Sequence, residues 1–309
     1  MLDLPSYVIV TPARNEAQFI ELTIRSVLAQ TVRPLKWVIV SDGSTDGMDD
    51  IVGKYAEYRW IELVRMPERR ERNFAGKVYA FNAGCARMIG LRYEVIVNLD
   101  ADTSFDADYF SFLLQRLAEA PKLGLVAGRL VDVVSNQSYK YEITGSDYVS
   151  GPCQVFRREC FEAIGGYRPL KSGGVDVVAV LSSRAKGWQT RTFIEKPYYH
   201  HRPMNGAQIK GLREKLYTGQ KAYRLGSHPV WETLRSLYQM TKRPYVIGGI
   251  LMLVGYFWSS LRGVEQTIPE ELIQFRRKDQ MSRLKFAFCR AAFGRVLKVP
   301  PRERKAISN

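Results

Sequence analysis

Short apolar runs alternate with amphipathic stretches over the first half of the chain. The apolar, β-branched runs predict buried strands over residues 7–11, 37–41, 60–65, 94–99 and 124–128. Apolar residues recur at helical spacing between them and predict helices over residues 16–30, 48–56, 74–88 and 109–120. Strands and helices that alternate in this way form parallel βαβ units with right-handed connections. The pattern therefore predicts an α/β fold with a doubly wound, mostly parallel sheet.

The pattern changes after residue 150, where glycine-rich loops separate shorter segments. We expect helices over 158–164 and 177–186, and a strand over 190–195. After Gly206 nearly every segment has helical spacing. A chain of 309 residues fits about two domains. We therefore expect an α/β domain over residues 1–205, followed by a helical region over residues 206–309.

Polar side chains follow three of the predicted strands, at the point where each strand ends. They are Asn15 and Glu16, then Asp42 and Asp46, then Asp100 and Asp102. In open α/β sheets, ligands bind outside the carboxyl ends of the strands. The sequence therefore predicts an acidic ligand site at this edge of the sheet.

The pair Asp100 and Asp102 can face one cation, since the two carboxylates stand two residues apart just after a strand. Mg²⁺ and Mn²⁺ prefer such oxygen ligands, often together with phosphate oxygens. A solvated turn is the alternative, but the position at a strand end favours a metal. His200 or His201 can add a further ligand; a structural histidine pair is the alternative there.

Three more residues have both a functional and a structural interpretation. Asp42, at a strand tip, suits a hydrogen bond to a base or ribose, or simply belongs to a turn. Lys77 lies near a helix N-terminus, where a bound anion would favour a lysine, or it is solvated. Asp176 follows two glycines and is either a helix cap or a general base.

Taken together, these residues resemble inverting glycosyltransferase family 2, which has the glycosyltransferase-A nucleotide-binding fold. The resemblance extends over residues 6–205. The family members that the chain resembles are bacterial or archaeal glycosyltransferases of polysaccharide and lipid-linked glycan synthesis. It rests on VTPARNEAQFIELTIRSVLAQT, WVIVSDGSTDG, GKVYAFNAG, VNLDADT, GGY and a GGVD loop before a helix ending SRAKGW.

The resemblance implies a nucleotide-diphosphate-sugar donor, with UDP as the commonest nucleotide among such enzymes. Residues that would border the nucleotide are Pro12, Ala13, Asn15 and Glu16. Asp42 would contact the base or ribose, and Lys77 would lie near the nucleotide side of the site.

The resemblance also implies a metal, Mn²⁺ or Mg²⁺, and a catalytic base. Asp100 and Asp102 match the family's DxD motif, with Asp102 as the direct metal ligand and His200 as a further metal contact. Asp176 falls where the family has its catalytic base, which takes a proton from an acceptor hydroxyl in a single, inverting displacement.

Two departures from the family pattern narrow the expected activity. Val175 precedes Asp176 where the family often has glutamate, so Asp176 is the only acid of that loop. The Q-x-x-R-W signature of processive synthases is absent. We therefore expect transfer of one sugar to a lipid-linked or polysaccharide acceptor, rather than processive polymer synthesis.

The charge is distributed unevenly along the chain. The sequence has 46 Lys and Arg against 31 Asp and Glu, a net charge of +15. Residues 207–309 hold 20 basic and 7 acidic side chains, a net charge of +13. An excess of this size fits an anionic partner, so the partner belongs to the C-terminal third of the chain.

Two C-terminal segments favour a membrane as that partner. Residues 244–261 carry no charge and, as a helix, would extend about 27 Å, so they lie in a membrane interface, span the membrane or form a core helix. Residues 273–299 predict a basic amphipathic helix, with Arg283, Arg290, Arg295 and Lys298 on one face. This face binds a membrane surface or is a solvated helix face. We expect an anionic membrane surface at the cytoplasmic face.

Two other functions fit parts of the sequence. A sugar-nucleotide nucleotidyltransferase shares the α/β pattern, but PARNE lacks the glycine-rich phosphate loop of those enzymes. A non-enzymatic polyanion-binding protein would use the basic tail. Because no nucleic-acid-binding module is recognisable, we do not expect nucleic acid as a partner.

Overall fold

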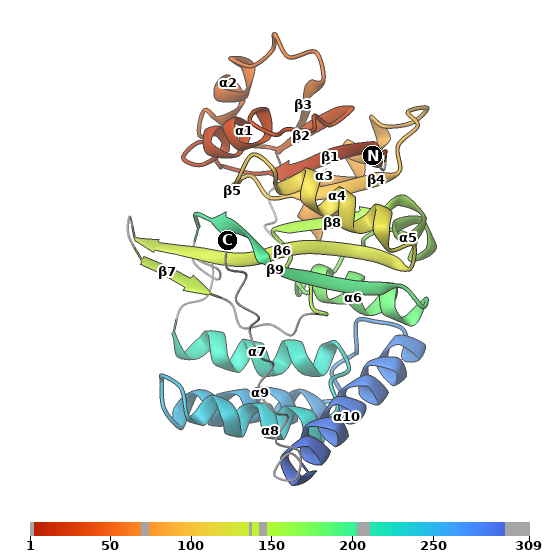
Figure 1. The fold of residues 1–309 in the computed structure, drawn as a ribbon. Helices are drawn as coiled ribbons and strands as arrows, with labels where there is room; N and C mark the ends of the chain where they lie inside the picture. Colours follow the sequence, from red (N-terminus) through yellow and green to blue (C-terminus); the bar gives the residue numbers. More distant parts are fainter. Residues whose placement is uncertain (1–2, 69–73, 136–137, 142–146, 203–210, 294–309) are drawn as a thin grey trace, which may run out of the picture. The chain divides into compact units, whose positions relative to one another are not determined.

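The computed structural model describes residues 3–68, 74–135, 138–141, 147–202 and 211–293 (Figure 1). The chain divides into two compact units, Met1–Glu214 and Lys215–Asn309. The predicted boundary between residues 205 and 206 lies outside the described residues and stays a prediction.

The first half of the N-terminal unit is a parallel α/β sheet. Its strands are β1 (Tyr7–Ala13), β2 (Lys36–Asp42), β3 (Ile61–Met66) and β4 (Val95–Leu99), in the order β3-β2-β1-β4. The helices are α1 (Ile20–Leu28), α2 (Met48–Gly53) and α3 (Ala75–Ala86). Nearly every residue of β1, β2 and β4 is buried, as expected of parallel strands whose faces are both covered. The predicted α/β fold is confirmed.

The second half of the sheet is mixed. Its elements are β5 (Thr103–Phe105), α4 (Tyr109–Glu119), β6 (Leu123–Ser135), β7 (Ser138–Tyr141), β8 (Cys153–Arg157), α5 (Arg158–Ala163), α6 (Val175–Ala185) and β9 (Gln189–His200). Strand β8 lies antiparallel between β4 and β6, whereas β9 runs parallel to β6. The parallel pattern therefore ends at β4, and the three short strands β5, β7 and β8 were not predicted from periodicity.

The C-terminal unit is helical, as predicted. It is built from α7 (Leu212–Arg224), α8 (Pro229–Met240), α9 (Ile247–Leu261) and α10 (Glu270–Phe293) (Figure 1). Glycines bring the first three helices close together: a Cβ on Gly249 would lie 2.3 Å from the Ser236 carbonyl oxygen, and one on Gly219 would lie 2.0 Å from that of Met252. The uncharged run thus forms a packed helix. None of the helices in the described ranges has the length and hydropathy of a membrane-spanning segment.

The sequence predicts that helix α10 has one basic face, but several of its basic side chains are bonded within the protein. Arg276 donates to the Leu225 carbonyl oxygen at 2.6 Å, and Arg277 donates to that of Gly226 at 3.3 Å. Both arginines therefore cap the C-terminal end of α7, where cations are favourable. Arg283 is paired with Asp279. Of the other residues predicted for this face, Arg295 and Lys298 lie outside the described residues.

Two neighbouring glycines of α9 provide a test of this packing. Gly249→Ala places a methyl group against the backbone of α8, whereas a Cβ on Gly248 would meet only ordinary contacts at 3.5 Å. We expect Gly249→Ala to lower the free energy of unfolding by about 1–3 kcal/mol. Gly248→Ala should leave it unchanged or raise it by up to about 1 kcal/mol, because alanine favours a helix. Denaturant unfolding followed by circular dichroism measures both; equal values for the two variants would contradict the packing.

Candidate active site

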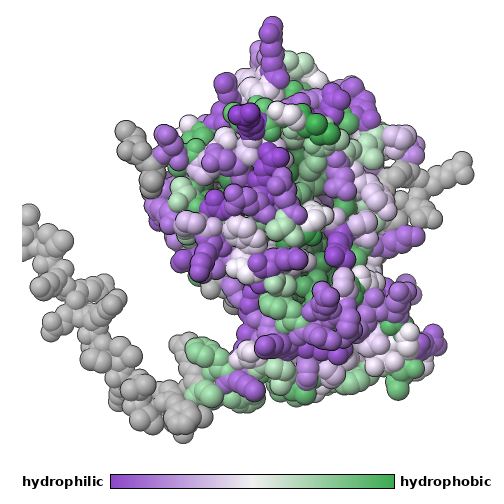
Figure 2. Space-filling view, turned by 90° about the vertical axis from the view of Figure 1, so that its right-hand side faces the viewer, coloured by the Kyte–Doolittle hydropathy of each residue, from purple (hydrophilic) through white to green (hydrophobic). Residues whose placement is uncertain are grey.

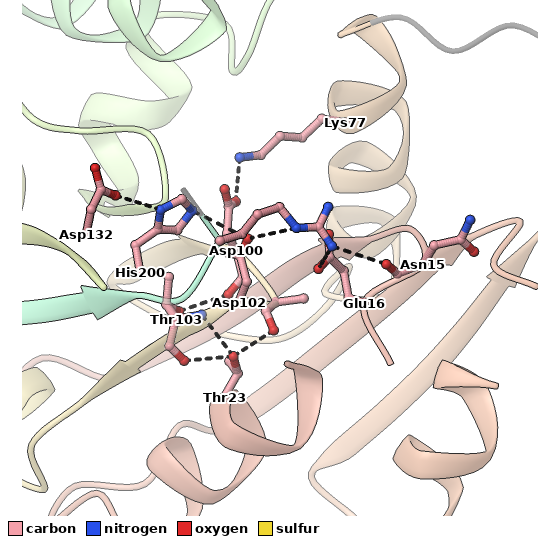
Figure 3. A network of polar contacts seen from close by, with 11 residues as sticks. Asn15, Glu16, Thr23, Lys77, Asp100, Asp102, Thr103, Asp132 and His200 are labelled. Atoms are coloured by element: carbon pink, nitrogen blue, oxygen red, sulfur yellow. Dashed lines mark hydrogen bonds and ion pairs between the residues drawn. The ribbon is translucent and has the colours of Figure 1, made fainter. Parts of the chain in front are cut away.

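Acidic side chains gather where β1 and β4 end, and the end of β9 adds a histidine (Figure 3). Asp100 and Asp102 follow β4, and Glu16 follows β1. His200 is the last residue of β9, where it pairs with Thr103 of β5 and with Asp132 of β6. Strand pairing therefore brings residues separated by about half the chain to one edge of the sheet.

A buried threonine of α1 fixes the loop that carries the two aspartates. The Thr23 hydroxyl lies 2.8 Å from the Ala101 carbonyl oxygen and 2.7 Å from that of Thr103, and it accepts a hydrogen bond from the Thr103 amide at 3.1 Å. The Thr103 hydroxyl in turn donates to the Asp100 carbonyl oxygen at 2.9 Å. Hydrogen bonds from Thr23 and from Thr103 thus fix the turn between Asp100 and Thr103. The direction in which the Asp100 and Asp102 side chains leave the turn is fixed with it.

Asp100 is paired with Lys77 of α3. Burial lowers the pKa of the Lys77 ammonium, but the Asp100 carboxylate outweighs burial and raises it, and the charges of Asp176 and Asp102 act in the same direction. Burial also raises the pKa of Asp100, against the effect of Lys77. The predicted basic residue of α3 therefore lies inside the acidic cluster, within the field of all three aspartates.

Asp102, His200 and Asp132 form a buried array. The His200 Nε2 atom lies 3.4 Å from Asp102 Oδ2, and its Nδ1 atom lies 3.0 Å from Asp132 Oδ1. Burial lowers the pKa of His200, but the two carboxylates outweigh burial and raise it to about 10. Asp102 Oδ1 is buried and has no hydrogen-bond partner within the described part of the chain.

The neighbouring His201 is directed elsewhere. Its Nε2 atom lies 2.7 Å from the Ser104 hydroxyl, and its ring stacks on Phe19 with centroids 6.4 Å apart. The structure therefore places His200, and not His201, beside the second aspartate of the DxD motif.

Arg202, which the sequence did not single out, connects the end of β9 to the loop after β1. It donates to Glu16 Oε2 at 2.6 Å and to the Asn15 carbonyl oxygen at 3.3 Å, and its Nε atom lies 3.9 Å from Asp102 Oδ2. Burial and the charge of Asp102 raise the pKa of Glu16 to about 8, although Arg202 opposes this shift. The sequence signal that could have identified Arg202 was its position directly after the histidine pair.

The loops after β1 and β2 are joined by side chains of the two predicted polar motifs. Asn15 has a φ of 55° and accepts a hydrogen bond from the Thr45 amide at 2.9 Å, while its own amide donates to the Ser44 hydroxyl at 3.1 Å. Asp46 accepts from the amides of Ala17 and Met48. Much of the DGSTDG motif therefore shapes the loop.

The remaining residues predicted near the nucleotide lie along the same edge. Pro12 and Ala13 are the last residues of β1, and register pairs them with Val40 and Ser41 of β2. Asp42 is the last residue of β2 and is buried. The structure thus places them at the strand ends that carry the acidic cluster.

Asp176 lies in the first turn of α6, after Gly174 with a φ of 91°. Tyr148 donates to Asp176 Oδ2 at 3.1 Å. The segment after Tyr148 is joined to β4, because the Gly151 carbonyl oxygen accepts from Asn98 at 3.1 Å and that of Pro152 accepts from the Asp100 amide at 2.8 Å. This segment therefore connects the candidate base to the strand that carries the two aspartates.

The donor set fits a divalent cation. Among the described residues, Asp102 offers an unpartnered buried oxygen. His200 would offer Nε2 after a bound cation displaces its proton, while Nδ1 is held by the Asp132 carboxylate, a common arrangement around metal-bound histidine. Within the described ranges, no group of three or more His, Cys, Asp or Glu side chains could hold a metal. The protein would thus supply two ligands and leave the others to phosphate or water, as in many Mg²⁺ and Mn²⁺ sites.

A comparison with protein families agrees with the resemblance. Residues 8–150 match the family described as glycosyl transferase family 2. The matched residues include the loops after β1, β2 and β4. Asp176 and His200 lie beyond the matched residues.

Curated relatives match about a third of the chain. The poly-beta-1,6-N-acetyl-D-glucosamine synthase of Staphylococcus aureus strain COL is 32% identical over 114 residues, which are 37% of this chain and 26% of that protein. Its counterpart in Staphylococcus epidermidis is 30% identical over a segment of the same length. The match spans about a quarter of these relatives' own length.

Solved structures share the fold at low identity. A mannosyltransferase from Pyrobaculum calidifontis, in complex with GDP-Man and Mn²⁺, aligns with a TM-score of 0.54 and 18% identity over 96% of this chain and 77% of its own. Staphylococcus aureus TarS, in complex with UDP-GlcNAc, aligns with a TM-score of 0.50 and 12% identity over 85% of this chain and 74% of its own. GalNAc-T7, with UDP, GalNAc and Mn²⁺, aligns with a TM-score of 0.55 and 13% identity over 97% of this chain and 59% of its own. These likenesses confirm the predicted glycosyltransferase-A fold.

The carboxylate behind His200 provides a test of the cation site. If Asp132 orients His200 for a metal, Asp132→Asn should weaken Mn²⁺ binding in the presence of UDP by about 10–100-fold. Electron paramagnetic resonance of free Mn²⁺ measures the affinity. Asp106→Asn, which changes an exposed carboxylate of the same unit, is the matched control and should bind Mn²⁺ as the wild type does. Equal affinity in all three proteins would contradict the site.

Proposed function

We propose that this chain, whose residues 8–150 match glycosyl transferase family 2, transfers one sugar from a nucleotide-diphosphate sugar to an acceptor hydroxyl with inversion at the anomeric carbon. The observation that carries the proposal is the convergence of Asp102 and His200 with Lys77, Asp100 and Asp176 at the carboxyl edge of the sheet. Such a transfer requires positive charge beside the leaving diphosphate, from Lys77 and a cation held by the acidic cluster, and a separate carboxylate for the acceptor proton.

The donor would bind across the ends of β1, β2 and β4. We assign the nucleotide to the loops that contain Pro12, Ala13, Asn15 and Glu16, and the base or ribose to Asp42. Lys77 and Asp100 would lie toward the diphosphate, where an ammonium attracts phosphate oxygens. UDP is our first choice of nucleotide, because two of the three similar structures named above contain UDP or a UDP-sugar; the mannosyltransferase contains GDP-Man.

Asp102 and His200 would hold Mn²⁺ or Mg²⁺, and Asp132 would hold His200 through its other ring nitrogen. A divalent cation, when bound, neutralises the negative charge that develops on the leaving diphosphate. Thr23 contributes indirectly, since it fixes the turn from which Asp102 projects.

Asp176 would act as the general base. The acceptor oxygen attacks the anomeric carbon from the face opposite the diphosphate and gives its proton to the Asp176 carboxylate. The bond between the anomeric carbon and the phosphate oxygen breaks, and the nucleotide diphosphate leaves with that electron pair. Tyr148 would position the carboxylate through its hydrogen bond to Oδ2, which leaves Oδ1 for the acceptor.

The acceptor would be a lipid-linked glycan or a polysaccharide. The curated relatives are named as synthases of poly-beta-1,6-N-acetyl-D-glucosamine, which supports a carbohydrate acceptor. We propose transfer of a single sugar, because the sequence lacks the Q-x-x-R-W signature of processive synthases. A location at the cytoplasmic face of the membrane would bring the enzyme to a lipid-linked acceptor.

The proposed base can be tested with a neutral substitution. A panel of UDP-, GDP- and dTDP-sugars, with and without Mn²⁺, first identifies the donor by thermal shift. We expect Asp176→Asn to lower transfer by about 10²–10⁴-fold, because the amide cannot accept the acceptor proton. The donor Kd should stay the same, since Asp176 serves the acceptor.

The matched control for that test is Asp50→Asn. Asp50 is an exposed acid in the first turn of α2, as Asp176 is an acid in the first turn of α6. Its substitution removes the same favourable charge from a helix N-terminus and should leave transfer unchanged. Turnover by Asp176→Asn near that of the control would overturn the assignment of the base.

A further inference from the structure

Helix α9 of the C-terminal unit has two faces of different character. One face carries Gly249 and Gly255, which pack against the backbones of α8 and α7. The other face carries large apolar side chains that stay exposed, each between 42% and 83%. These are Ile247, Ile250, Val254, Phe257, Trp258 and Leu261. We call this set the α9 stripe.

The α9 stripe is continuous along the helix. At the rotation of an ideal α-helix, its six residues fall within an arc of about 100°, so they form one ridge and not a scatter. The helix has 15 residues, which correspond to a ridge of about 22 Å. Scattered apolar side chains at a surface need no explanation, but a contiguous apolar face marks an interaction surface.

The ends of the α9 stripe are basic and aromatic. The Arg262 guanidinium lies 4.6 Å from the centroid of the Trp258 ring, and the Lys242 ammonium lies 4.3 Å from that of the exposed Tyr238 ring. Tyr245 is also exposed. Aromatic rings beside cationic side chains, at the edge of an apolar face, are typical of protein surfaces at the level of lipid headgroups.

The charged residues next to the α9 stripe in the sequence are basic. The sequence has no acidic residue between Glu232 and Glu265, whereas Arg235, Lys242, Arg243 and Arg262 lie in that interval. In the space-filling view, apolar surface and hydrophilic side chains lie next to one another on the C-terminal unit (Figure 2). An apolar ridge bounded by cations complements an apolar layer beneath anionic headgroups.

We infer that the α9 stripe is the surface with which this protein binds an anionic lipid bilayer, with α9 lying in the plane of the interface. This inference specifies the membrane location that is part of the proposed function. Burial of apolar side chains below the headgroups and attraction of the flanking cations to anionic lipid act together on such a helix. The glycine face stays packed within the protein, so only one side of α9 enters the lipid.

A second copy of the chain is a less suitable occupant. Two α9 stripes face to face would bring the basic ends of both helices together, whether the helices ran parallel or antiparallel, since Lys242 and Arg243 lie before the stripe and Arg262 lies after it. Like charges placed together across an interface oppose association. Anionic headgroups remove that repulsion.

Co-sedimentation with vesicles tests the inference. The full chain should bind vesicles of phosphatidylcholine with phosphatidylglycerol more strongly than vesicles of phosphatidylcholine alone, and added salt should weaken binding. In a variant with Ile250→Ser, Phe257→Ser and Leu261→Ser, the partition coefficient should fall by at least about 100-fold, because each apolar side chain withdrawn from water contributes on the order of tenfold.

The matched control is Ile89→Ser, which removes an apolar side chain that is 86% exposed in the N-terminal unit. It should bind vesicles as the wild type does. A wild type that does not bind anionic vesicles, a stripe variant that binds like the control, or a control that loses as much binding as the stripe variant would overturn the inference. So would a dimer in sedimentation velocity that the stripe variant dissociates while vesicle binding is kept.

Quenching by brominated lipids gives a second readout that does not depend on a loss of binding. Trp258 lies in the α9 stripe, so bromine on the acyl chains should quench part of the wild-type tryptophan fluorescence. Trp258→Phe keeps an apolar ring and should bind vesicles while losing that quenching. Unchanged quenching in Trp258→Phe would overturn the inference. Neither assay uses transfer, so its failure is distinct from failure of the proposed activity.

Discussion

The burial of carboxylates at the end of a hydrophobic sheet is the constraint on which the rest of the site depends. Withdrawing a carboxylate from water costs on the order of several kcal/mol unless a partner compensates. Asp100 has Lys77 as its partner, and Asp132 has His200. Asp102 has His200 on one oxygen and, among the residues that the structure describes, no hydrogen-bond partner on the other. We propose that a cation binds at this second oxygen, Asp102 Oδ1.

The same constraint explains why several elements come together there. Thr23 of α1 fixes the turn after β4, and Arg202 connects the end of β9 to the loop after β1. Tyr148 and the residues after it join α6 to β4. The proposed base and the proposed metal ligands therefore share one rigid frame, although they come from distant parts of the sequence. Positioning of this kind is what a displacement between two substrates needs.

Local pattern was sufficient to predict the parallel half of the fold. The strands β1, β2 and β4 are continuous apolar runs whose side chains are buried on both faces of the sheet. The polar residues of the site follow these strands directly in the sequence. Asp100 and Asp102 could therefore be placed from sequence. The mixed half was harder, because β5 and β8 are short and their pairing depends on strands far along the chain. Asp132 and Arg202 were missed for that reason, since the pairing of β9 with β6 and with β5 brings them to the site.

The basic excess of the C-terminal third was found from sequence, but the structural role of some of its arginines was not. Arg276 and Arg277 satisfy carbonyl groups at the end of α7, so part of that charge stabilises the fold of the unit. The apolar face of α9 could not be separated from its glycine face by composition, because both belong to one uncharged run. Packing distinguishes them, since only glycine permits the close approach of α7 and α8.

Anomalous diffraction from crystals grown with UDP and Mn²⁺ tests the central claim most directly. The account predicts one manganese peak within coordinating distance of Asp102 Oδ1 and His200 Nε2, with His200 Nδ1 still bonded to Asp132. A manganese peak that is bound to the UDP diphosphate but contacts neither Asp102 nor His200 would contradict it.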